Sequence, residues 1–226
     1  MKELIKTFFQ DFVEPFFPQV AGSIHFTSVK FLEQENFTDI HVGEKRRIDI
    51  LAEVKLKEQD QIILIHAEPQ ASYQIEFNER MFIYCSRLYE NYRKPILPFA
   101  VFSYSDRRTV LNQFKIDVPS YSVLTFHYYQ IHLINKKWRD FIRKDNPVAT
   151  ALPSKMNYTK RERVQVKLEF LRMIYRMDLN PAQMTLIYGF FETYLKLNEK
   201  ACCTCRIHIE IKEGLKGLKL VKKKVS

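Results

Sequence analysis

Two neighbouring runs with the residue spacing of β-strands constrain this chain most. In residues 47–56 the apolar positions Ile48, Ile50, Ala52 and Val54 alternate with a side that includes Asp49 and Glu53. In residues 61–70 a continuous apolar run, 62–65, suits a strand that is covered on both faces. The charged residues 57–60 separate the two runs, so the sequence predicts a β-hairpin.

The length of the turn predicts the register of this hairpin. Leu51 is expected opposite His66, and Asp49 opposite Glu68. Because side chains alternate along a strand, His66, Glu68 and Gln70 are then expected on one face beside Asp49. A shift of one residue would separate them.

The rest of the chain predicts further strands and several helices. Apolar residues recur at helical spacing in residues 1–16, 74–92, 159–177 and 181–197. Residues 29–37, 96–104 and 121–134 have the composition of strands. This order of elements predicts an α/β fold with a mixed sheet and a C-terminal helical pair.

A chain of 226 residues suits one domain with a short addition. We expect a core over residues 1–150, the helical pair over 151–199, and a basic tail without regular structure over 200–226. The hydrophobic content of 46% excludes disorder as the main state.

The net charge of +10 points to an anionic partner, but its distribution weakens that inference. Residues 200–226 hold eight Lys and Arg and two acidic residues, so the tail carries most of the excess. The charge fits a nucleic-acid-binding protein and an ordinary enzyme equally well.

The N-terminal segment lacks the features of a secretory signal, because Asp11 and Glu14 interrupt its apolar stretch. The longest charge-free run, residues 118–135, includes Pro119 and several polar residues, which favours a strand over a membrane span. We therefore expect a cytosolic protein that does not enter membranes.

The expected pairing of Asp49 with Glu68 is the feature that points to a chemical role for this hairpin. Two carboxylates with Cβ atoms roughly 5 Å apart repel each other, so one takes a proton or a cation bridges them. Mg²⁺ binds one or two carboxylates and leaves positions for water and phosphate oxygens. Gln70 is not a base near neutral pH, but its amide can orient water or phosphate. Pro69, which cannot donate a backbone hydrogen bond, suggests that the strand ends at this site.

Four segments together resemble the Rpn family of recombination-promoting nucleases and transposase-like proteins, within the PD-(D/E)XK nuclease superfamily. They are residues 47–51 (RIDIL), 63–70 (ILIHAEPQ), 77–84 (FNERMFIY) and 95–104 (PILPFAVFSY). The resemblance extends over most of residues 1–200.

The resemblance implies a restriction-endonuclease-like core and a metal-dependent DNA endonuclease linked to recombination or mobile elements. It implies Asp49 and Glu68 as ligands of Mg²⁺ or Mn²⁺, with Gln70 where most of the superfamily has lysine. The superfamily often adds an acid from the first helix, which makes Glu14 a candidate, although a solvent-exposed position is the simpler and favoured explanation of Glu14. The tail departs from the family pattern.

Several alternatives stay open at this point. His66 is either catalytic or a hydrogen-bonded structural histidine, and Arg80 either contacts a phosphate or forms a surface ion pair. The chain is an active nuclease, a catalytically silent relative that binds DNA or a protein, or an RNA-directed enzyme. Cleavage of two strands would favour a homodimer, for which the late helices offer apolar stripes.

Overall fold

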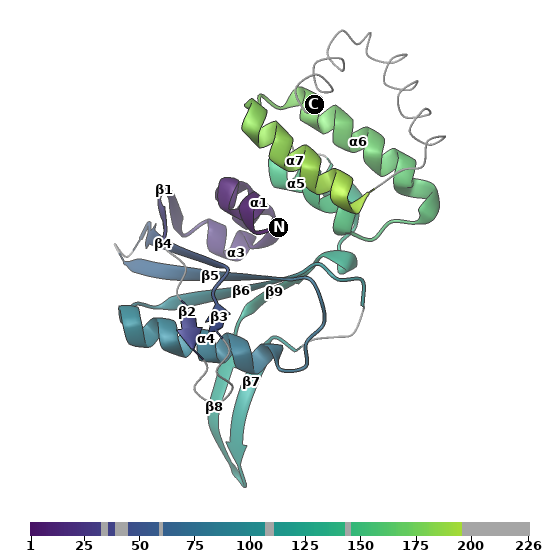
Figure 1. The fold of residues 1–226 in the computed structure, drawn as a ribbon. Helices are drawn as coiled ribbons and strands as arrows, with labels where there is room; N and C mark the ends of the chain where they lie inside the picture. The colour runs from purple at the N-terminus through teal and green to yellow at the C-terminus, as the bar shows by residue number, and fades with distance from the viewer. Residues whose placement is uncertain (33–35, 39–44, 59–60, 107–110, 143–145, 196–226) are drawn as a thin grey trace, which may run out of the picture. The chain divides into compact units, whose positions relative to one another are not determined.

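The computed structural model describes residues 1–32, 36–38, 45–58, 61–106, 111–142 and 146–195. The predicted tail over 200–226 therefore lies outside the described residues. Figure 1 shows the elements, which form two compact units. We call them the sheet unit (Lys2 and Phe16–Leu133) and the helical unit (Met1, Glu3–Pro15 and the described residues from Ile134 on). The predicted boundary near residue 150 stays a prediction.

The sheet unit is built on a five-stranded mixed sheet with the order β1-β4-β5-β6-β9. Its strands are β1 (Ile24–Phe31), β4 (Ile50–Leu56), β5 (Ile62–Gln70), β6 (Ile96–Phe102) and β9 (Tyr129–His132). β4 runs antiparallel to β1 and β5, whereas β6 runs parallel to β5 and β9. The predicted α/β class with a mixed sheet is confirmed. Two short strands, β2 (Asn36–Thr38) and β3 (Lys45–Arg47), pair separately.

Helix α4 (Phe77–Tyr92) covers one face of this sheet (Figure 1). Its apolar residues form two buried clusters with side chains from the strands. In one cluster Phe77 and Met81 meet Ala100 of β6, and in the other Leu88 meets Leu64 of β5. The core thus forms where the apolar face of α4 packs against the side chains that point to one face of the strands. The short helix α3 (Pro18–Ala21) completes the helices of the sheet unit.

The opposite face of the sheet is also apolar. Phe17 stacks on Phe99 of β6, with 4.2 Å between ring centroids. The strands β5 and β6 are therefore buried on both faces, as the continuous apolar run in residues 62–65 predicted.

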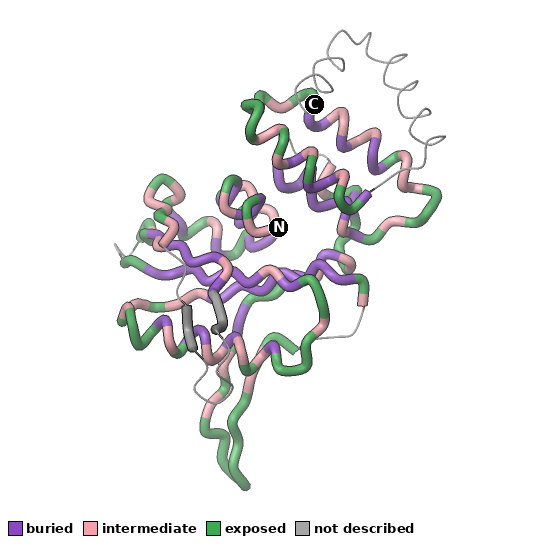
Figure 2. The backbone as a smooth tube through the Cα atoms, in the orientation of Figure 1, coloured by how far each residue is buried: buried purple, intermediate pink, exposed green. Residues whose placement is uncertain are grey.

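A two-stranded ribbon, β7 (Gln113–Val118) and β8 (Tyr121–His127), projects beyond α4 (Figure 1). Phe82 of α4 stacks on Phe114 and contacts Phe126, with centroid distances of 5.3 and 5.7 Å. The ribbon turns at Ser120, whose φ is +66°. Figure 2 shows that its outer part is exposed.

The helical unit contains α1 (Lys2–Thr7, without Lys2 itself), most of α2 (Phe9–Phe16), α5 (Pro147–Ala151), α6 (Arg163–Arg176) and α7 (Pro181–Tyr194). In the part of the chain that the structure describes, four short 3₁₀ helices connect elements: η1 (Leu133–Asn135), η2 (Trp138–Asp140), η3 (Leu152–Lys155) and η4 (Lys160–Glu162). The predicted C-terminal helical pair is confirmed as α6 and α7, which pack through Phe170 and Phe191 with 3.6 Å between ring centroids.

A proline explains one long-range contact of the helical unit. Pro15 lies inside α2 and has no N–H for the carbonyl of Asp11. The Asn146 Nδ2 donates to that carbonyl oxygen at 2.8 Å. The side-chain oxygen of Asn146 also caps α5 by accepting from the Ala149 N–H at 2.8 Å.

The structure corrects several predicted boundaries. The expected N-terminal helix is divided at Phe8, whose φ and ψ are −124° and 50°. The expected strand over 121–134 is two strands of different sheets, because the buried Tyr128 separates β8 from β9. β7 was not predicted, nor was α5, which has Asn146 as its cap and Pro147 as its first residue.

No helix among the described residues is both long and apolar enough to cross a lipid bilayer. The charge-free run of residues 118–135 is accordingly placed in strands and a 3₁₀ turn, as expected.

Candidate functional site

The predicted register of the hairpin is confirmed. Leu51 lies opposite His66 and Ile50 lies opposite Ala67 in the antiparallel β4–β5 pair. Asp49 precedes β4 at a bend, one position beyond the last of these pairs, where the register points it toward Glu68. The two carboxyl groups therefore come from consecutive strands at the end of the β4–β5 pairing.

Alternation along β5 places His66, Glu68 and Gln70 on the face that α4 covers. Their exposed fractions are 0%, 6% and 7%, so all three are buried polar groups. Buried polar groups in proteins are hydrogen-bonded or paired, so their partners show what the site is built to hold.

β5 ends at Gln70, at the site and one residue after Pro69, as expected, and both residues still pair with β6. The Leu64 N–H donates to the Pro95 carbonyl oxygen, and the Ser103 N–H donates to the Gln70 carbonyl oxygen. Because backbone groups alternate in direction along a strand, the even-numbered residues of β5 direct their N–H and C=O groups toward β6. Pro69 therefore directs its backbone away from β6, toward the side on which the β4 pairing has ended. Because the β4–β5 pairing has ended at Ala67, no carbonyl of β4 needs a hydrogen bond from position 69, and a proline fits there.

Glu68 lies between two nitrogen-bearing side chains. Its Oε2 is 3.4 Å from His66 Nε2, and its Oε1 is 3.8 Å from Arg80 Nη2. The ring of His66 also packs edge-on against Tyr84 of α4, with 5.6 Å between centroids. Because His66 is fully buried, it orients Glu68 and does not offer a surface to a substrate.

Gln70 is engaged at both ends of its amide. Its Oε1 accepts from Arg80 Nη2 at 2.9 Å, and its Nε2 donates to the Ser72 carbonyl at 3.0 Å. The amide expected to orient water or phosphate is thus occupied by a guanidinium and a backbone oxygen. In this arrangement Gln70 holds Arg80.

Arg80 is the cation that joins these groups. Besides Gln70 and Glu68 it contacts the side-chain oxygen of Gln74, and it lies over the Phe77 ring at 5.1 Å from the centroid. Its Nε is buried and has no hydrogen-bond partner among the described residues. A guanidinium has five donors, so Arg80 keeps capacity for an anionic ligand.

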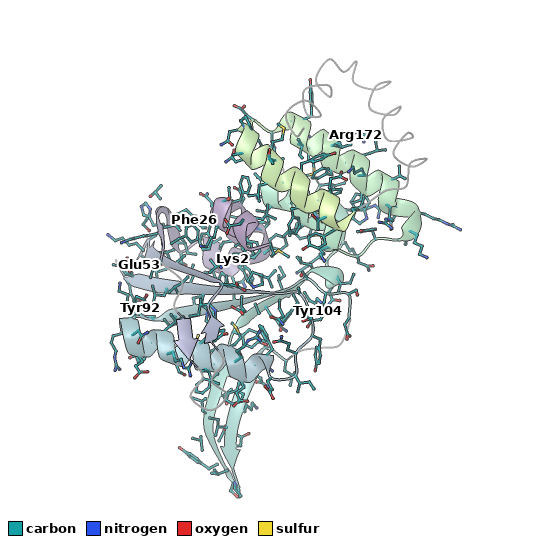
Figure 3. The ribbon with its side chains drawn as sticks, in the orientation of Figure 1. Lys2, Phe26, Glu53, Tyr92, Tyr104 and Arg172 are labelled. Carbon is teal, nitrogen blue, oxygen red and sulfur yellow. The ribbon has the colours of Figure 1, made fainter. Side chains whose placement is uncertain are left out.

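Asp49 has an unfavourable electrostatic environment. Burial raises the pKa of its carboxyl above the ordinary value of 3.8, and the nearby Glu68 carboxylate raises this pKa further. Lys2, labelled in Figure 3, opposes these effects with its Nζ 3.6 Å from Asp49 Oδ1. The two carboxyl groups therefore interact, as the register argument required.

The described residues hold no group of three or more His, Cys, Asp and Glu side chains arranged to bind a metal ion. Asp49 and Glu68 nevertheless offer carboxylate oxygens, which Mg²⁺ prefers, and Mg²⁺ commonly keeps several waters with one or two carboxylates. The mutual repulsion of Asp49 and Glu68 fits a site for a cation.

Glu14 belongs to the helical unit, is exposed and accepts a hydrogen bond from Gln10 at 2.8 Å. This contact agrees with the solvent-exposed alternative, and its role at the site stays a prediction. Glu53 shares the face of Asp49 on β4 but forms an ion pair with Lys94 (Figure 3 labels Glu53).

Sequence reasoning missed two residues that contact the site. Lys2 pairs with Asp49 across a sequence distance that no local pattern bridges. Gln74 contacts Arg80 from just before α4, six residues away, and a polar residue at a helix entry could have suggested it.

Comparison with models of known protein families, with curated proteins and with solved structures gives no match for this chain. The resemblance to the Rpn family therefore stays a prediction, and the geometry of the site carries the functional proposal.

Proposed function

We propose that this chain is a metal-dependent nuclease that hydrolyses phosphodiester bonds of DNA. Asp49 and Glu68 would hold Mg²⁺ or Mn²⁺. The observation that carries this proposal is the approach of two carboxyl groups from consecutive strands, where Glu68 raises the pKa of Asp49. The choice of DNA rests on the resemblance to the Rpn family.

When bound, a divalent ion supplies acidity for water and offsets charge that develops on phosphorus. The residues of the chain then divide the remaining tasks. His66 orients Glu68, since its Nε2 lies 3.4 Å from that carboxylate. Arg80 would bind a phosphate oxygen through an Nη hydrogen that Gln70, Gln74 and Glu68 do not use, and Gln70 holds the guanidinium in place.

A second function is favoured by a specific observation. In the structure the Lys2 and Arg80 side chains already lie near Asp49 and Glu68, so cations of the chain itself partly neutralise the carboxylates. A protein of the same fold that binds DNA or another protein without cleaving it would keep the ion pairs of Lys2 with Asp49 and of Arg80 with Glu68, because it needs no metal ion there.

The two functions are separated by a plasmid-nicking assay. The proposed nuclease nicks plasmid DNA with Mg²⁺ or Mn²⁺, stops with EDTA, and loses at least ~100-fold in rate as Asp49→Ala or Glu68→Ala. The exposed Glu79 of α4 provides the matched control, and Glu79→Ala is expected to nick as the wild type does.

A readout without catalysis completes the experiment. The metal ion alone should raise the unfolding temperature of the wild type and of Glu79→Ala, but not that of Asp49→Ala. DNA binding without nicking in every divalent metal would support the silent relative, and cleavage of RNA but not DNA would support the RNA-directed alternative.

A further inference from the structure

The positive charge of the chain is unevenly distributed along its length. Residues 134–195 contain 12 Lys and Arg and six Asp and Glu, whereas residues 1–133 contain 15 and 17. The part of the chain that holds Asp49 and Glu68 therefore has no positive excess. The excess that precedes the tail lies in residues 134–195 of the helical unit, which points to an anionic partner for that unit.

Two segments of this basic part lie side by side and enclose a hollow. The Asn157 N–H donates to the Lys136 carbonyl oxygen at 3.1 Å, and Lys137 forms an isolated β-bridge with Asn157. The hollow has a volume of about 450 Å³. Residues 137–140 line it from one segment, and residues 157–159 with Glu162 line it from the other.

Four cationic side chains stand around this hollow, and we call them the basic surface. Lys136 and Lys137 belong to the first segment, and Lys160 and Arg161 follow the lining residues 157–159 in the second. All four are exposed, and none of them forms an ion pair with another residue that the structure describes. Asp140, an exposed acid that also lines the hollow, offsets one of these charges.

The acid Glu162 does not neutralise the basic surface, because it has a cation of its own. Arg139 forms an ion pair with Glu162, whose carboxylate also accepts from the Thr159 N–H at 2.7 Å. This backbone hydrogen bond and Arg139 hold the pKa of Glu162 at about 2, so Glu162 is charged at neutral pH. The Arg139 guanidinium lies over the Trp138 ring, 4.5 Å from its centroid. The four exposed cations therefore keep their charge for a partner.

The composition of this surface indicates the chemistry of its partner. A polyanion such as nucleic acid is bound by several Lys and Arg side chains that each neutralise a phosphate. Stable binding to a membrane surface adds buried apolar side chains to such cations. The described residues between 134 and 163 include no large apolar side chain that is exposed. The surface therefore favours nucleic acid over a membrane.

We propose that the basic surface of the helical unit binds the phosphate backbone of duplex DNA. Phosphate contacts position a protein on the duplex and carry no sequence information. The helical unit thus supplies affinity for DNA of any sequence, while Asp49 and Glu68 belong to the sheet unit. The choice of DNA rests on the proposed function, whereas the charge and the place of the surface do not depend on it.

The test measures binding of the full chain to a labelled duplex of about 20 base pairs in EDTA, where a metal-dependent nuclease does not cleave. Lys137→Gln and Arg161→Gln each remove one exposed cation of the basic surface. Each change should weaken binding about fivefold or more at ~0.1 M salt. Each should also reduce the steepness of log K against log salt concentration by about 1.

Arg176→Gln is the matched control for these variants. It removes the same charge from an exposed position at the C-terminal end of α6, whereas Arg161 precedes the N-terminal end of this helix. Its affinity and salt dependence should equal those of the wild type. Residues 200–226 also carry excess Lys and Arg, but they are the same in every variant.

Trp138 gives a readout that is local to the basic surface, because it is the single tryptophan of the chain and lines the hollow. Duplex DNA should change the Trp138 emission of the wild type and of Arg176→Gln, and the change should saturate with the binding curve. Lys137→Gln and Arg161→Gln should need more DNA for the same change.

Equal affinity and equal salt dependence of all three variants, or an unchanged Trp138 emission at saturating DNA, would overturn the proposal. Tighter binding of an RNA duplex, or an emission change with anionic lipid vesicles but not with DNA, would assign the surface to those partners instead. Selective loss of binding in a chain that nicks no plasmid would support this inference without the nuclease proposal. Nicking of plasmid with equal affinity of all variants would do the reverse.

Discussion

Asp49 is the residue at which the proposed function and the stability of the fold oppose each other. Its carboxyl has a raised pKa, so the native state binds this proton more tightly than the unfolded chain does. Stability therefore falls as pH rises from the ordinary value of 3.8 through the raised native value. The folded protein retains the repulsion between the partly buried Asp49 carboxylate and the buried Glu68 carboxylate.

We predict that Asp49→Asn stabilises the protein at neutral pH and not at a pH of about 3, where both states hold the proton. The gain should stay below about 1 kcal/mol, because the side chain is 37% exposed and solvent screens its charge. Urea unfolding at both pH values measures it, with Glu79→Gln as the exposed control. A loss of stability at neutral pH would contradict the argument.

Gln70 and Arg80 form the second residue-scale prediction. Their hydrogen bond joins a charged donor to a buried amide, so the two side chains should be energetically coupled. A double-mutant cycle with Gln70→Leu and Arg80→Met should give a coupling of about 1.5 kcal/mol in the free energy of unfolding.

The second pair in this comparison is Gln10 with Glu14, an exposed helical pair that should couple by less than about 0.5 kcal/mol. Equal coupling in both pairs would mean that Gln70 does not hold Arg80.

At the scale of elements, α4 anchors both the site and the ribbon. It provides Arg80 to one side and Phe82 to the β7–β8 ribbon. We expect Phe82→Ala to destabilise the protein by about 1–2 kcal/mol, since its side chain is partly buried. Native-state hydrogen exchange should show the largest loss of protection in β7 and β8, while β5 and β6 keep theirs.

Tyr89 provides a control on the same helix, because it is 53% exposed and its replacement by alanine removes little packing. If Phe82→Ala and Tyr89→Ala affected the ribbon equally, the ribbon would not depend on α4.

The hairpin of β4 and β5 could be predicted because local alternation and turn length determine its register, and thereby the approach of Asp49 to Glu68. α4 followed from its helical period. By contrast, β7 has only three apolar residues at alternate positions, which is a weak signal for a strand. No Gly or Pro separates β8 from β9, so the sequence does not show that these two strands belong to different sheets.

At the scale of the whole molecule, and leaving the single residue Lys2 aside, the chain passes between its two units twice. Residues 3–15 group with residues from Ile134 on, and the sheet unit lies between them in sequence. This grouping could not be predicted, because the bond of Asn146 with the Asp11 carbonyl joins residues 135 positions apart. Local patterns carry no information on such contacts.

We predict that Asn146→Ala costs about 2 kcal/mol or more in the free energy of unfolding, since it removes the cap of α5 and leaves the Asp11 carbonyl without its donor. Asn180→Ala removes a cap alone, at the start of α7, and should cost about 1 kcal/mol. Thermal and urea unfolding measure both, and equal losses would show that the bond to Asp11 contributes nothing.

Pro69 explains why Asp49 stays available at the end of β4. One more rung of the β4–β5 ladder would join Ile48 to Pro69 and draw Asp49 into regular strand geometry. Pro69 has no N–H to donate to Ile48, so the pairing of β4 with β5 stops at Ile50, and Asp49 stays at the bend before β4. A residue with an N–H at position 69 would lengthen the strand and straighten the backbone on which this carboxylate depends.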